Sequence, residues 1–261
     1  MNASSFRLPE LSVRFVPVWQ RNFLVWKKLA IASVLGNVAE PLITLIAFGY
    51  GLGSLLKEIN GVPYIAFLAS GSICMSVMMA SSFEALYSAF SRMHVQKTWE
   101  ALLNTPLALD DIVLAEMLWA ATKSLISGMA ILAVLFGLGI GLHPTTLLVP
   151  PLLFIIGMTF ASIALIVNAL AKAYDFFTYY FTLVLTPMIF LSGVYYPSTQ
   201  LPDWLQTLAA LLPLSAAVDL VRPLLLGQMP ESPALKLAAL LAYGATGFYL
   251  ALVLTRRRLL K

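Results

Sequence analysis

The stretch SGVYYPSTQLPDWLQTLAALLPLSAAVDLVRPLLLG, residues 192–227, interrupts a chain that is otherwise almost uniformly apolar. It contains four prolines, at positions 197, 202, 213 and 223, and two short apolar runs, Leu205–Leu212 and Ala216–Leu226. Each run is too short to cross a bilayer, because a hydrocarbon core about 30 Å thick requires about 20 helical residues. The stretch therefore predicts two short helices, separated at Pro213, that do not cross.

The rest of the chain suits a lipid environment. Of its 261 residues, 60% are hydrophobic and only 11% are charged, whereas about 25% of the residues of an ordinary soluble domain are charged. The apolar runs are continuous, which disfavours a β-barrel, because barrel strands alternate between the two faces over about ten residues. We therefore predict an all-α membrane protein with six transmembrane helices. The predicted spans are Ala32–Gly53, Tyr64–Tyr87, Leu118–Leu138, Leu147–Leu170, Phe177–Tyr196 and Leu235–Leu254.

The distribution of basic residues predicts the orientation of these spans. With the N terminus in the cytoplasm, 13 of the 16 Lys and Arg residues fall on the cytoplasmic side, and only Lys57, Arg222 and Lys236 fall outside. An excess of Lys and Arg in cytoplasmic loops is typical of multi-pass membrane proteins. Both termini are therefore predicted to be cytoplasmic, and the formal net charge of +4 reflects topology and does not indicate nucleic-acid binding.

Residues that commonly carry catalysis or bind metals are sparse. The two histidines, His94 and His143, are predicted on opposite sides of the membrane, and the single cysteine, Cys74, lies inside the second span. The sequence also lacks a G-x-x-x-x-G-K-[ST] phosphate-binding loop. We therefore predict no catalytic residues, no metal site and no cofactor bound by this chain.

Residues 1–30 include the segment PVWQRNFLVWKK, which has the pattern of an amphipathic helix. Trp19, Phe23 and Trp26 share one helical face, and Arg21 lies on another. Such a helix can lie in the membrane interface with its rings toward the acyl chains and its cations toward anionic headgroups, so that membrane lipids are a partner. The alternative is a helix packed on the protein's own cytoplasmic surface.

The predicted cytoplasmic loop of residues 91–112 contains a short helix followed by the start of another. The first helix covers Thr98–Asn104 and ends at the Thr105–Pro106 pair, because the residue before a proline disfavours the helical conformation. The second begins at Asp110 and Asp111, whose carboxylates suit the positive end of a helix dipole.

The first of these helices is a candidate docking element for a soluble partner. Trp99, Leu102 and Leu103 would supply an apolar anchor, and Glu100 would supply a specific charge. The alternative is that the segment is only an ordered connector.

Three segments carry a resemblance to a known family. They are EPLITLIAFGYGLG (residues 40–53), TWEALLNTPLALDDIVLAE (residues 98–116) and FLSGVYYP with LPDWLQTLAALLPLSAAVDLVRPLLLG (within residues 190–227). In this order, after a basic amphipathic N terminus, they resemble the membrane subunits of ABC-2 type exporters, and most closely the branch that exports nodulation lipooligosaccharides. The resemblance implies a single ABC-2 transmembrane domain over residues 1–261, located in the bacterial inner membrane.

The resemblance also implies roles for the two short-helix regions. Residues 197–230 correspond to re-entrant helices that enter the membrane from outside, between the fifth and sixth spans, and turn back at Pro213. Within them, Asp219 and Arg222 are spaced by three residues and can pair. The cytoplasmic loop corresponds to the coupling helix that docks on an ATPase. The implied coupling residues are Thr98, Trp99, Glu100, Ala101, Leu102, Leu103, Thr105 and Pro106.

Glu40 is the main charge deep in the predicted membrane region, where a carboxylate costs about 2.5–3.5 kcal/mol on insertion scales. Pro41 beside it removes a helical hydrogen bond and can bend the helix. Glu40 is interpreted either as a polar spot at the permease interface or substrate entrance, or as a carboxyl bonded to a neighbouring helix such as the one bearing Asn168. Glu84, nearer the cytoplasmic end of the second span, is interpreted as a simple interfacial carboxylate.

The fifth predicted span carries aromatic and hydroxyl side chains. Phe177 and Tyr180 belong either to an interfacial aromatic belt, which is the usual arrangement, or to a path where rings stack on sugars or acyl chains. Thr178, Thr182 and Thr186 form a stripe, which predicts either a hydroxyl-lined wall or close helix packing.

The resemblance implies a complete transporter with two copies of a separate ATPase, which binds ATP and Mg, and a second copy of this chain or a close paralogue. The expected function is outward export of an amphiphile such as a glycolipid, lipooligosaccharide or lipid-linked saccharide. Export of drugs or hydrophobic peptides is the alternative. An ion-coupled secondary transporter, which ordinarily has more intramembrane charges, and a structural subunit are further alternatives.

Overall fold

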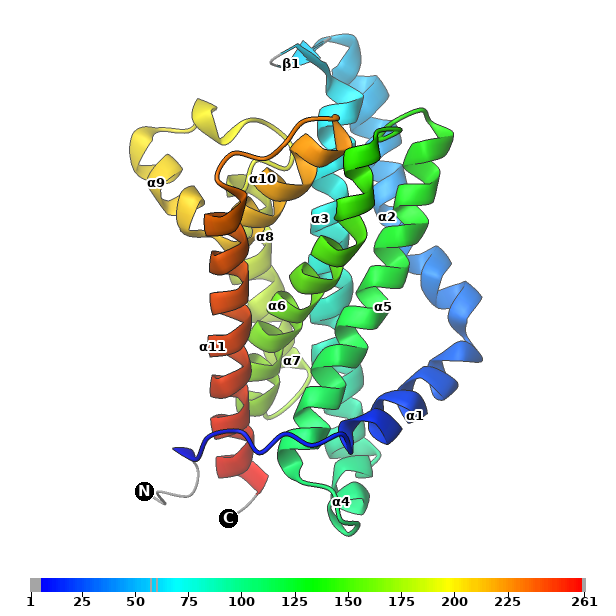
Figure 1. Cartoon of the computed structure of the whole chain (residues 1–261), viewed down its shortest axis with the longest axis vertical. Helices are drawn as coiled ribbons and strands as arrows, with labels where there is room; N and C mark the ends of the chain where they lie inside the picture. Colours follow the sequence, from blue (N-terminus) through cyan, green and yellow to red (C-terminus); the bar gives the residue numbers. More distant parts are fainter. Residues whose placement is uncertain (1–5, 57, 60, 260–261) are drawn as a thin grey trace.

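The computed structural model describes residues 6–56, 58–59 and 61–259, most of which form helices that run along the long axis of the molecule (Figure 1). The all-α prediction is confirmed for these residues, apart from a short hairpin of β1 (Glu58–Ile59) and β2 (Val62–Pro63). The α-helices are α1 Phe15–Lys27, α2 Ala30–Gly51, α3 Tyr64–Phe83, α4 Thr98–Leu103, α5 Leu109–Gly137, α6 Val149–Leu170, α7 Asp175–Tyr180, α8 Thr186–Leu191, α9 Asp203–Leu211, α10 Pro213–Leu225 and α11 Pro233–Leu259. The 3₁₀ and π turns are η2 Leu52–Ser54, η3 Glu84–Ser88, η4 Ser91–Val95, η5 Pro144–Leu148, η6 Phe181–Leu185 and η7 Ser198–Gln200.

Five segments of the described chain are long and apolar enough to cross a membrane, and they match five of the six predicted spans. They are Ala30–Ser54, Tyr64–Val95, Leu109–Gly137, Pro144–Leu170 and Pro233–Leu259.

The fifth predicted span, Phe177–Tyr196, is shorter than expected. The helical segment covers Asp175–Leu191 and ends before Gly193, whose backbone has a φ of 73°. A left-handed residue cannot continue a right-handed helix, so the helix stops there. The π turn η6 lies within the segment, next to Pro187, which lacks the N–H needed for a regular helical hydrogen bond. By length and composition, the described residues therefore contain five helices that can span a membrane, or six if the bent pair Asp203–Leu211 and Pro213–Leu225 counts as one span.

Helix α6 is the centre of the bundle and packs against α3, α5 and α11. Helices in a membrane depend on close packing, because lipid tails are as apolar as their side chains. Gly157 of α6 permits such packing, since a β-carbon there would lie only 3.0 Å from Cα of Ala121 in α5. Any larger side chain at this position would push α5 and α6 apart.

Helices α9 and α10 are the two short helices predicted from the proline-rich stretch. Their axes meet at 84°, and Pro213 begins α10, a position where its missing N–H costs nothing. Helix α10 packs against α3 and α11. Both short helices lie at one end of the bundle, which we call the α9 end (Figure 1).

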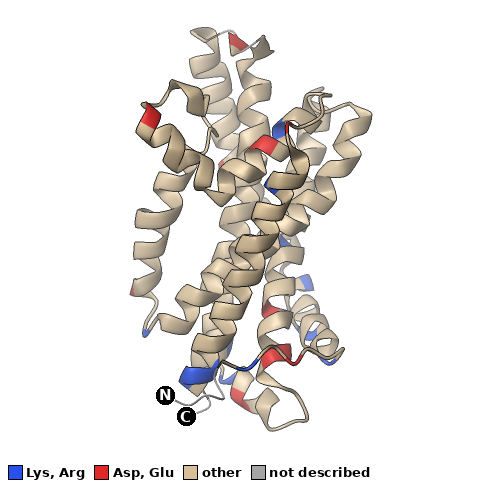
Figure 2. Ribbon diagram, turned by 60° about the vertical axis from the view of Figure 1, so that its left-hand side comes forward, with Lys and Arg blue, Asp and Glu red and all other residues tan. Residues whose placement is uncertain are grey.

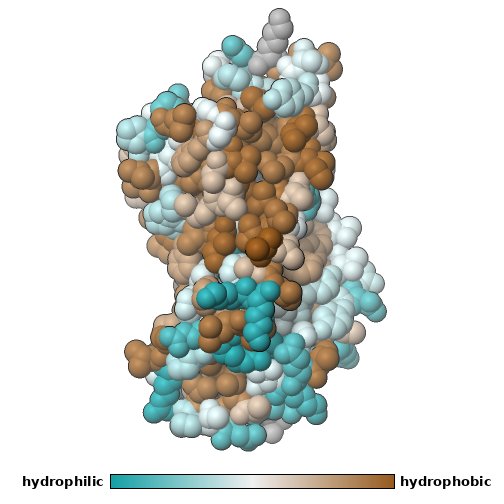
Figure 3. Space-filling view, turned by 90° about the vertical axis from the view of Figure 1, so that its right-hand side faces the viewer, coloured by the Kyte–Doolittle hydropathy of each residue, from teal (hydrophilic) through white to brown (hydrophobic). Residues whose placement is uncertain are grey.

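The opposite end, which we call the α4 end, holds α1 and α4, the first described residues and the end of α11 (Figure 1). Charged residues are concentrated in this part of the molecule and are fewer toward the α9 end (Figure 2). One side of the bundle, which includes α2, is hydrophobic in its upper part and hydrophilic near the α4 end (Figure 3). This boundary is the arrangement expected where a membrane surface meets the protein.

Candidate functional site

Residues 6–14 form a strap across the α4 end of the bundle. Asp110 and Asp111, in the first turn of α5, hold this N-terminal strap: Asp110 accepts a hydrogen bond from a strap N–H at 2.9 Å, and Asp111 accepts from the N–H and the hydroxyl of Ser12 at 2.8 Å each. Arg256 of α11 pairs with Asp110 and donates to two strap carbonyls. The acidic pair therefore ties the strap to α5 and α11 in addition to starting a helix.

The aromatic face of α1 packs on α5. The rings of Trp19, Phe23 and Trp26 lie 5.8 to 6.4 Å from the ring of Trp119, and the indole of Trp19 donates to the Thr122 hydroxyl at 3.1 Å. These contacts agree with the alternative of packing on the protein itself, but all three rings are only half-buried, so their orientation toward acyl chains stays a prediction. Trp119, a large ring in the middle of α5, offers a better partner than lipid because its edge and faces can be contacted specifically.

Helix α4 carries the predicted coupling residues, but its tryptophan points inward. Trp99 is 2% exposed, and its indole N–H donates to the carboxylate of Glu116 at 3.2 Å. The prediction that Trp99 belongs to an exposed docking surface is therefore wrong, because a buried carboxylate holds its indole inside the bundle. Of the other coupling residues, the exposed ones are Glu100, Ala101, Thr105 and Pro106, and the half-buried ones are Thr98, Leu102 and Leu103.

Two arginines near the N terminus connect to the α4 region. Arg21 of α1 donates to the Thr98 hydroxyl at 3.5 Å, and Arg14 donates to the carbonyl of Pro106. These contacts bracket α4 at its two ends. A displacement of α4 would therefore also displace α1 through these two arginines.

A buried ion cluster of Glu84, Arg92, Glu116 and Lys123 connects the segment after α3 to α5. Glu84 accepts from Arg92 at 3.0 Å and from Lys123 at 2.7 Å, and Arg92 also donates through Nε to Glu116 at 2.9 Å. The Trp119 indole donates to Glu84 at 2.8 Å. The interpretation of Glu84 as a simple interfacial carboxylate is therefore wrong, because its side chain joins α3 to α5 through several charge-assisted hydrogen bonds.

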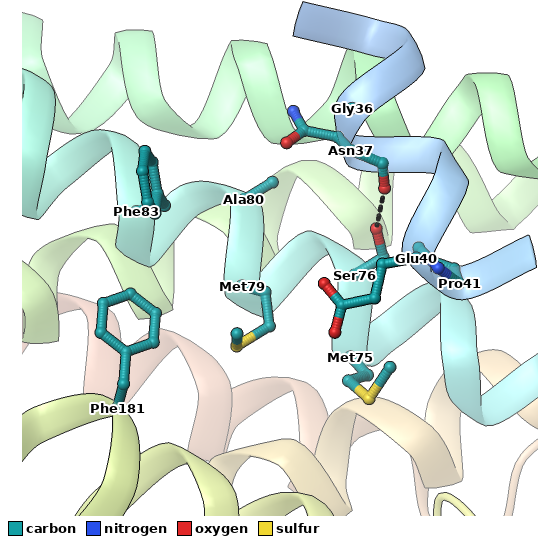
Figure 4. A pocket seen from close by; sticks show the side chains of 10 residues that line it. All are labelled: Gly36, Asn37, Glu40, Pro41, Met75, Ser76, Met79, Ala80, Phe83 and Phe181. Atoms are coloured by element: carbon teal, nitrogen blue, oxygen red, sulfur yellow. Dashed lines mark hydrogen bonds between the residues drawn. The ribbon is translucent and has the colours of Figure 1, made fainter. Parts of the chain in front are cut away.

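Glu40 lies in a different environment, at a cavity of about 230 Å³ between α2 and α3. Figure 4 shows its carboxylate directed into this cavity, near Met75 and Met79. Glu40 is exposed, and within the described part of the chain its carboxylate has no hydrogen bond or ion pair. Pro41 frees the carbonyl of residue 37 from the helical pattern, and the Ser76 hydroxyl donates to this carbonyl at 3.5 Å (Figure 4).

The alternative that Glu40 bonds to the helix bearing Asn168 is wrong. The Asn168 amide donates to the carbonyls of Ala85 and Leu86 at 2.8 and 3.3 Å. These carbonyls belong to the π turn η3, where the regular helical hydrogen bonds are disturbed. The Asn168 amide is therefore used by backbone groups of η3 and does not bond to Glu40.

The predicted path residues of the segment Asp175–Leu191 lie on two different faces. Phe177 and Tyr180 are buried inside the bundle, with 0% and 4% exposure. Thr178, Thr182 and Thr186 are exposed on the outer face. The structure therefore does not bring the aromatic and threonine side chains into one site.

The predicted pairing of Asp219 with Arg222 is wrong. Asp219 pairs with Lys236 of α11 at 2.8 Å. Arg222 donates to the Ser70 hydroxyl at 2.9 Å and to the Gly193 carbonyl at 2.7 Å. Arg222 thus fastens α10 to α3 and to the end of the preceding segment, while Asp219 reaches the next helix.

Comparison of the sequence with known proteins shows the family of this chain. Residues 14–226 match the family described as ABC-2 type transporter. The chain belongs to this family. It is 45% identical over 253 residues to Nodulation protein J of Sinorhizobium fredii (strain NBRC 101917 / NGR234), covering 97% of each chain. It is 47% identical over 254 residues to Nodulation protein J of Rhizobium leguminosarum bv. trifolii, again covering 97% of each chain.

A more distant relative is the inner membrane transport permease YadH of Escherichia coli (strain K12), 26% identical over 198 residues, which cover 76% of this chain and 77% of the relative. The match to the ABC-2 family and the apolar helices together establish an integral membrane transport subunit that is not an enzyme. An ABC-2 permease works with an ATP-binding partner and is typically dimeric.

Proposed function

We propose that this chain is the permease subunit of an ATP-driven exporter that moves an amphiphile, a lipooligosaccharide or a related glycolipid, outward across the bacterial inner membrane. The observation that carries this proposal is the 45% identity to Nodulation protein J along 97% of both chains. The chain has no phosphate-binding loop of its own. ATP and Mg are therefore assigned to a separate ATPase, present in two copies.

In the proposed topology, the α4 end and both termini face the cytoplasm, and α9 and α10 are re-entrant helices at the outer side. The bias of 13 basic residues out of 16 toward one side supports this orientation. The sharp bend between α9 and α10 supports a hairpin that turns back inside the membrane, since backbone that turns there must be covered by protein. Helix α10 is covered in this way by α3 and α11.

The proposed coupling element is α4 with the Thr105–Pro106 turn. The exposed Glu100 and Ala101 would contact the ATPase, while Trp99 carries the motion inward to Glu116 and the buried ion cluster. Arg21 carries the same motion to α1. ATP binding would then bias the permease between two conformations, provided that the nucleotide-bound ATPase binds them with different affinities.

The proposed transport path lies between two copies of the permease, along α2 and the outer face of Asp175–Leu191. In the most apolar 18-residue stretch of Ala30–Ser54, only 17% is buried inside one chain. Most of this helix is therefore available for contacts with lipid or a second copy. The Glu40 carboxylate, which has no partner among the described residues, and the hydroxyls of Thr178, Thr182 and Thr186 are among the polar groups on these surfaces. In a water-filled path they would remain solvated, which lowers the cost of the charge.

Co-expression with an ATP-binding partner subunit tests this proposal. The complex would be purified, reconstituted in lipid vesicles and assayed for ATP hydrolysis with and without lipooligosaccharide. The docking variant is Glu100→Arg, and its matched control is Glu231→Arg, another exposed glutamate outside the α4 region. We expect Glu100→Arg to lower partner affinity about tenfold, or roughly 1.4 kcal/mol, and Glu231→Arg to behave as wild type.

The outcomes separate the competing functions. Stimulation of hydrolysis by lipooligosaccharide supports the proposed substrate, whereas stimulation only by drugs or hydrophobic peptides would replace it with the alternative. Failure of any ATP-binding partner to join the permease, or identical behaviour of the two variants, would overturn the docking assignment. The chain would then be tested as a secondary carrier or a structural subunit.

A further inference from the structure

A second cavity, of about 280 Å³, lies at the α4 end between α1, the start of α2, the segment 84–96 that follows α3, and α5. Its wall includes polar and charged groups from each of these segments, among them the Glu84 carboxylate with its partners Arg92 and Lys123, and apolar groups near the α1–α2 junction. The residues that matter here are Arg21, Asn22, Trp26, Leu29 and Lys123. None of them belongs to the Glu40 cavity, so the two cavities are separate features.

Two N–H donors at this cavity lack an acceptor. The Asn22 side-chain amide and the Trp26 indole N–H are both buried, and neither has a hydrogen-bond partner in the described part of the chain. Other indoles at this end differ: Trp99 donates to Glu116 and Trp119 donates to Glu84. Buried donors without partners are uncommon and call for an explanation, such as a bound group that supplies the acceptor.

Arg21, in the same part of α1, has no direct ion pair with a carboxylate in the described part of the chain. Arg21 donates to the Asn22 side-chain oxygen and to the Thr98 hydroxyl, but it forms no salt bridge in the described part of the chain. The neighbouring cations differ, because Arg92 and Lys123 are both paired with Glu84. Burial, and then the positive charge of Arg92, lower the pKa of Arg21, and the negative charge of Glu116 offsets only part of this decrease. This direction is the one expected for a guanidinium that lacks a carboxylate partner.

These three groups define the chemistry of the missing partner. An amide N–H, an indole N–H and a guanidinium are all donors, so the partner must offer several acceptor oxygens and a negative charge. A phosphate group meets this requirement, and arginine is well suited to bind it. A carboxylate from the protein itself would also do so, but Glu84 and Glu116 are already held by Arg92.

The surroundings indicate that the phosphate belongs to a lipid. The cavity is also lined by Val25 and Leu29, which are exposed, and Leu24 exposes a further 60% of its surface on α1. Figure 3 shows that the hydrophobic side of the bundle gives way to a hydrophilic surface near this end. A phosphate with acyl chains attached could place its headgroup among the donors and its chains along the apolar residues, as at other interfacial helices.

We propose that the cavity bounded by Arg21, Asn22 and Trp26 binds the phosphate headgroup of an anionic membrane phospholipid, such as phosphatidylglycerol. The lipid fills a polar gap between α1 and the α3–α5 pair and thereby fastens α1 to the bundle. Its assignment to the inner leaflet rests on the proposed topology, but the binding itself does not require the ATPase or the transported substrate. Failure of the proposed function and failure of this site are therefore separate results.

Native mass spectrometry of the delipidated full-length permease tests the site. The protein would be titrated with phosphatidylglycerol, with phosphatidylcholine and with inorganic phosphate, and the bound fraction would be measured for each. We expect one phosphatidylglycerol to bind in preference to phosphatidylcholine and inorganic phosphate. Equal binding of inorganic phosphate would overturn the lipid assignment, and equal binding of phosphatidylcholine would overturn the requirement for an anionic lipid.

Three variants locate the binding. Arg21→Gln removes the charge and should weaken phosphatidylglycerol binding about tenfold, whereas Trp26→Phe and Asn22→Leu each remove one neutral donor and should weaken it about fivefold. Trp204→Phe is the matched control, because this tryptophan is 66% exposed and lies on α9 at the other end of the molecule. Unchanged affinity in both Arg21→Gln and Trp26→Phe would overturn the proposal. Trp26→Phe preserves an aromatic ring, so it keeps the test valid if Arg21→Gln fails to fold.

Discussion

Two carboxylates in membrane-spanning segments, Glu84 and Glu40, differ in their burial and in their hydrogen-bond partners. Glu84 is 3% exposed and accepts hydrogen bonds from Arg92, Lys123 and Trp119. Glu40 is exposed and has no such partner in the described residues. A carboxylate that the chain itself satisfies serves to join helices, whereas one that it leaves open is available to a second copy, water or a substrate.

The largest effect on stability is expected from removing the Glu84 carboxylate from the buried ion cluster. Glu84→Ala leaves Arg92 and Lys123 without their shared carboxylate, and removal of one partner from a buried ion pair typically costs about 3–5 kcal/mol. Thermal unfolding of the purified permease in detergent should show a large decrease in Tm. Glu58→Ala, at an exposed glutamate in β1, is the control. An unchanged Tm for Glu84→Ala would mean that the cluster does not join α3 to α5.

A smaller effect is expected at the N-terminal strap. Asp110→Ala removes the partner of Arg256 and one acceptor for the strap backbone, and hydrogen bonds to charged groups contribute about 1.5–3 kcal/mol each. Hydrogen exchange should become faster in residues 6–14, with a moderate decrease in Tm. Asp175→Ala, at an exposed aspartate in the first turn of α7, should leave exchange in the strap as in wild type. Equal protection in both variants would contradict the strap contacts.

Within α4, neighbouring side chains should respond differently. Trp99→Phe keeps the aromatic ring but removes the donor to Glu116, and we expect a loss of about 1.5 kcal/mol in the free energy of unfolding. Glu100→Ala changes an exposed side chain and should alter this quantity by less than about 0.5 kcal/mol. Chemical unfolding of both variants measures the difference. A larger loss for Glu100→Ala would show that the two sides of α4 are assigned in reverse.

The smallest effect on stability is expected at Glu40. Glu40→Gln removes a charge that has no partner in the described part of the chain, so the free energy of unfolding should change by less than about 0.5 kcal/mol. Substrate-stimulated ATP hydrolysis in vesicles should nevertheless change, because the cavity would lose its one carboxylate. A decrease in Tm comparable to that of Glu84→Ala would show that Glu40 is a structural residue after all.

The sequence alone predicted the features that depend on neighbouring residues in the chain, namely the long helices and the break between two short ones. Continuous apolar runs located the long helices, since about 20 apolar residues in a row suit a membrane span. Pro213 marked the break between α9 and α10 because proline favours the first position of a helix. The short helix predicted over Thr98–Asn104 is also present, as Thr98–Leu103 followed by a turn.

Contacts between distant segments could not be obtained in this way. Asp219 and Arg222 have a spacing that permits pairing within one helix, but Lys236 and Ser70, on other helices, compete successfully for them. Trp99 has the sequence context of an exposed anchor, and only the position of Glu116 shows that it is buried.

The ion cluster left a partial signal in the sequence. Glu116, Trp119 and Lys123 are spaced by three and four residues, so they share one face of α5. That face predicts a polar contact, but it does not identify Glu84 and Arg92 as the residues across from it. The partners follow from how α3 packs against α5, which depends on side chains along both helices.

The N-terminal strap has a consequence for the order of events during synthesis. Asp110 and Arg256 are separated by 146 positions, so a ribosome adding about 5–20 residues per second makes the arginine about 7 to 30 seconds after the aspartate. Throughout that interval the strap has one of its anchors but lacks the other. The contacts of the strap with Arg256 therefore form late in biogenesis, because they require α11 to be packed beside α5 and α6.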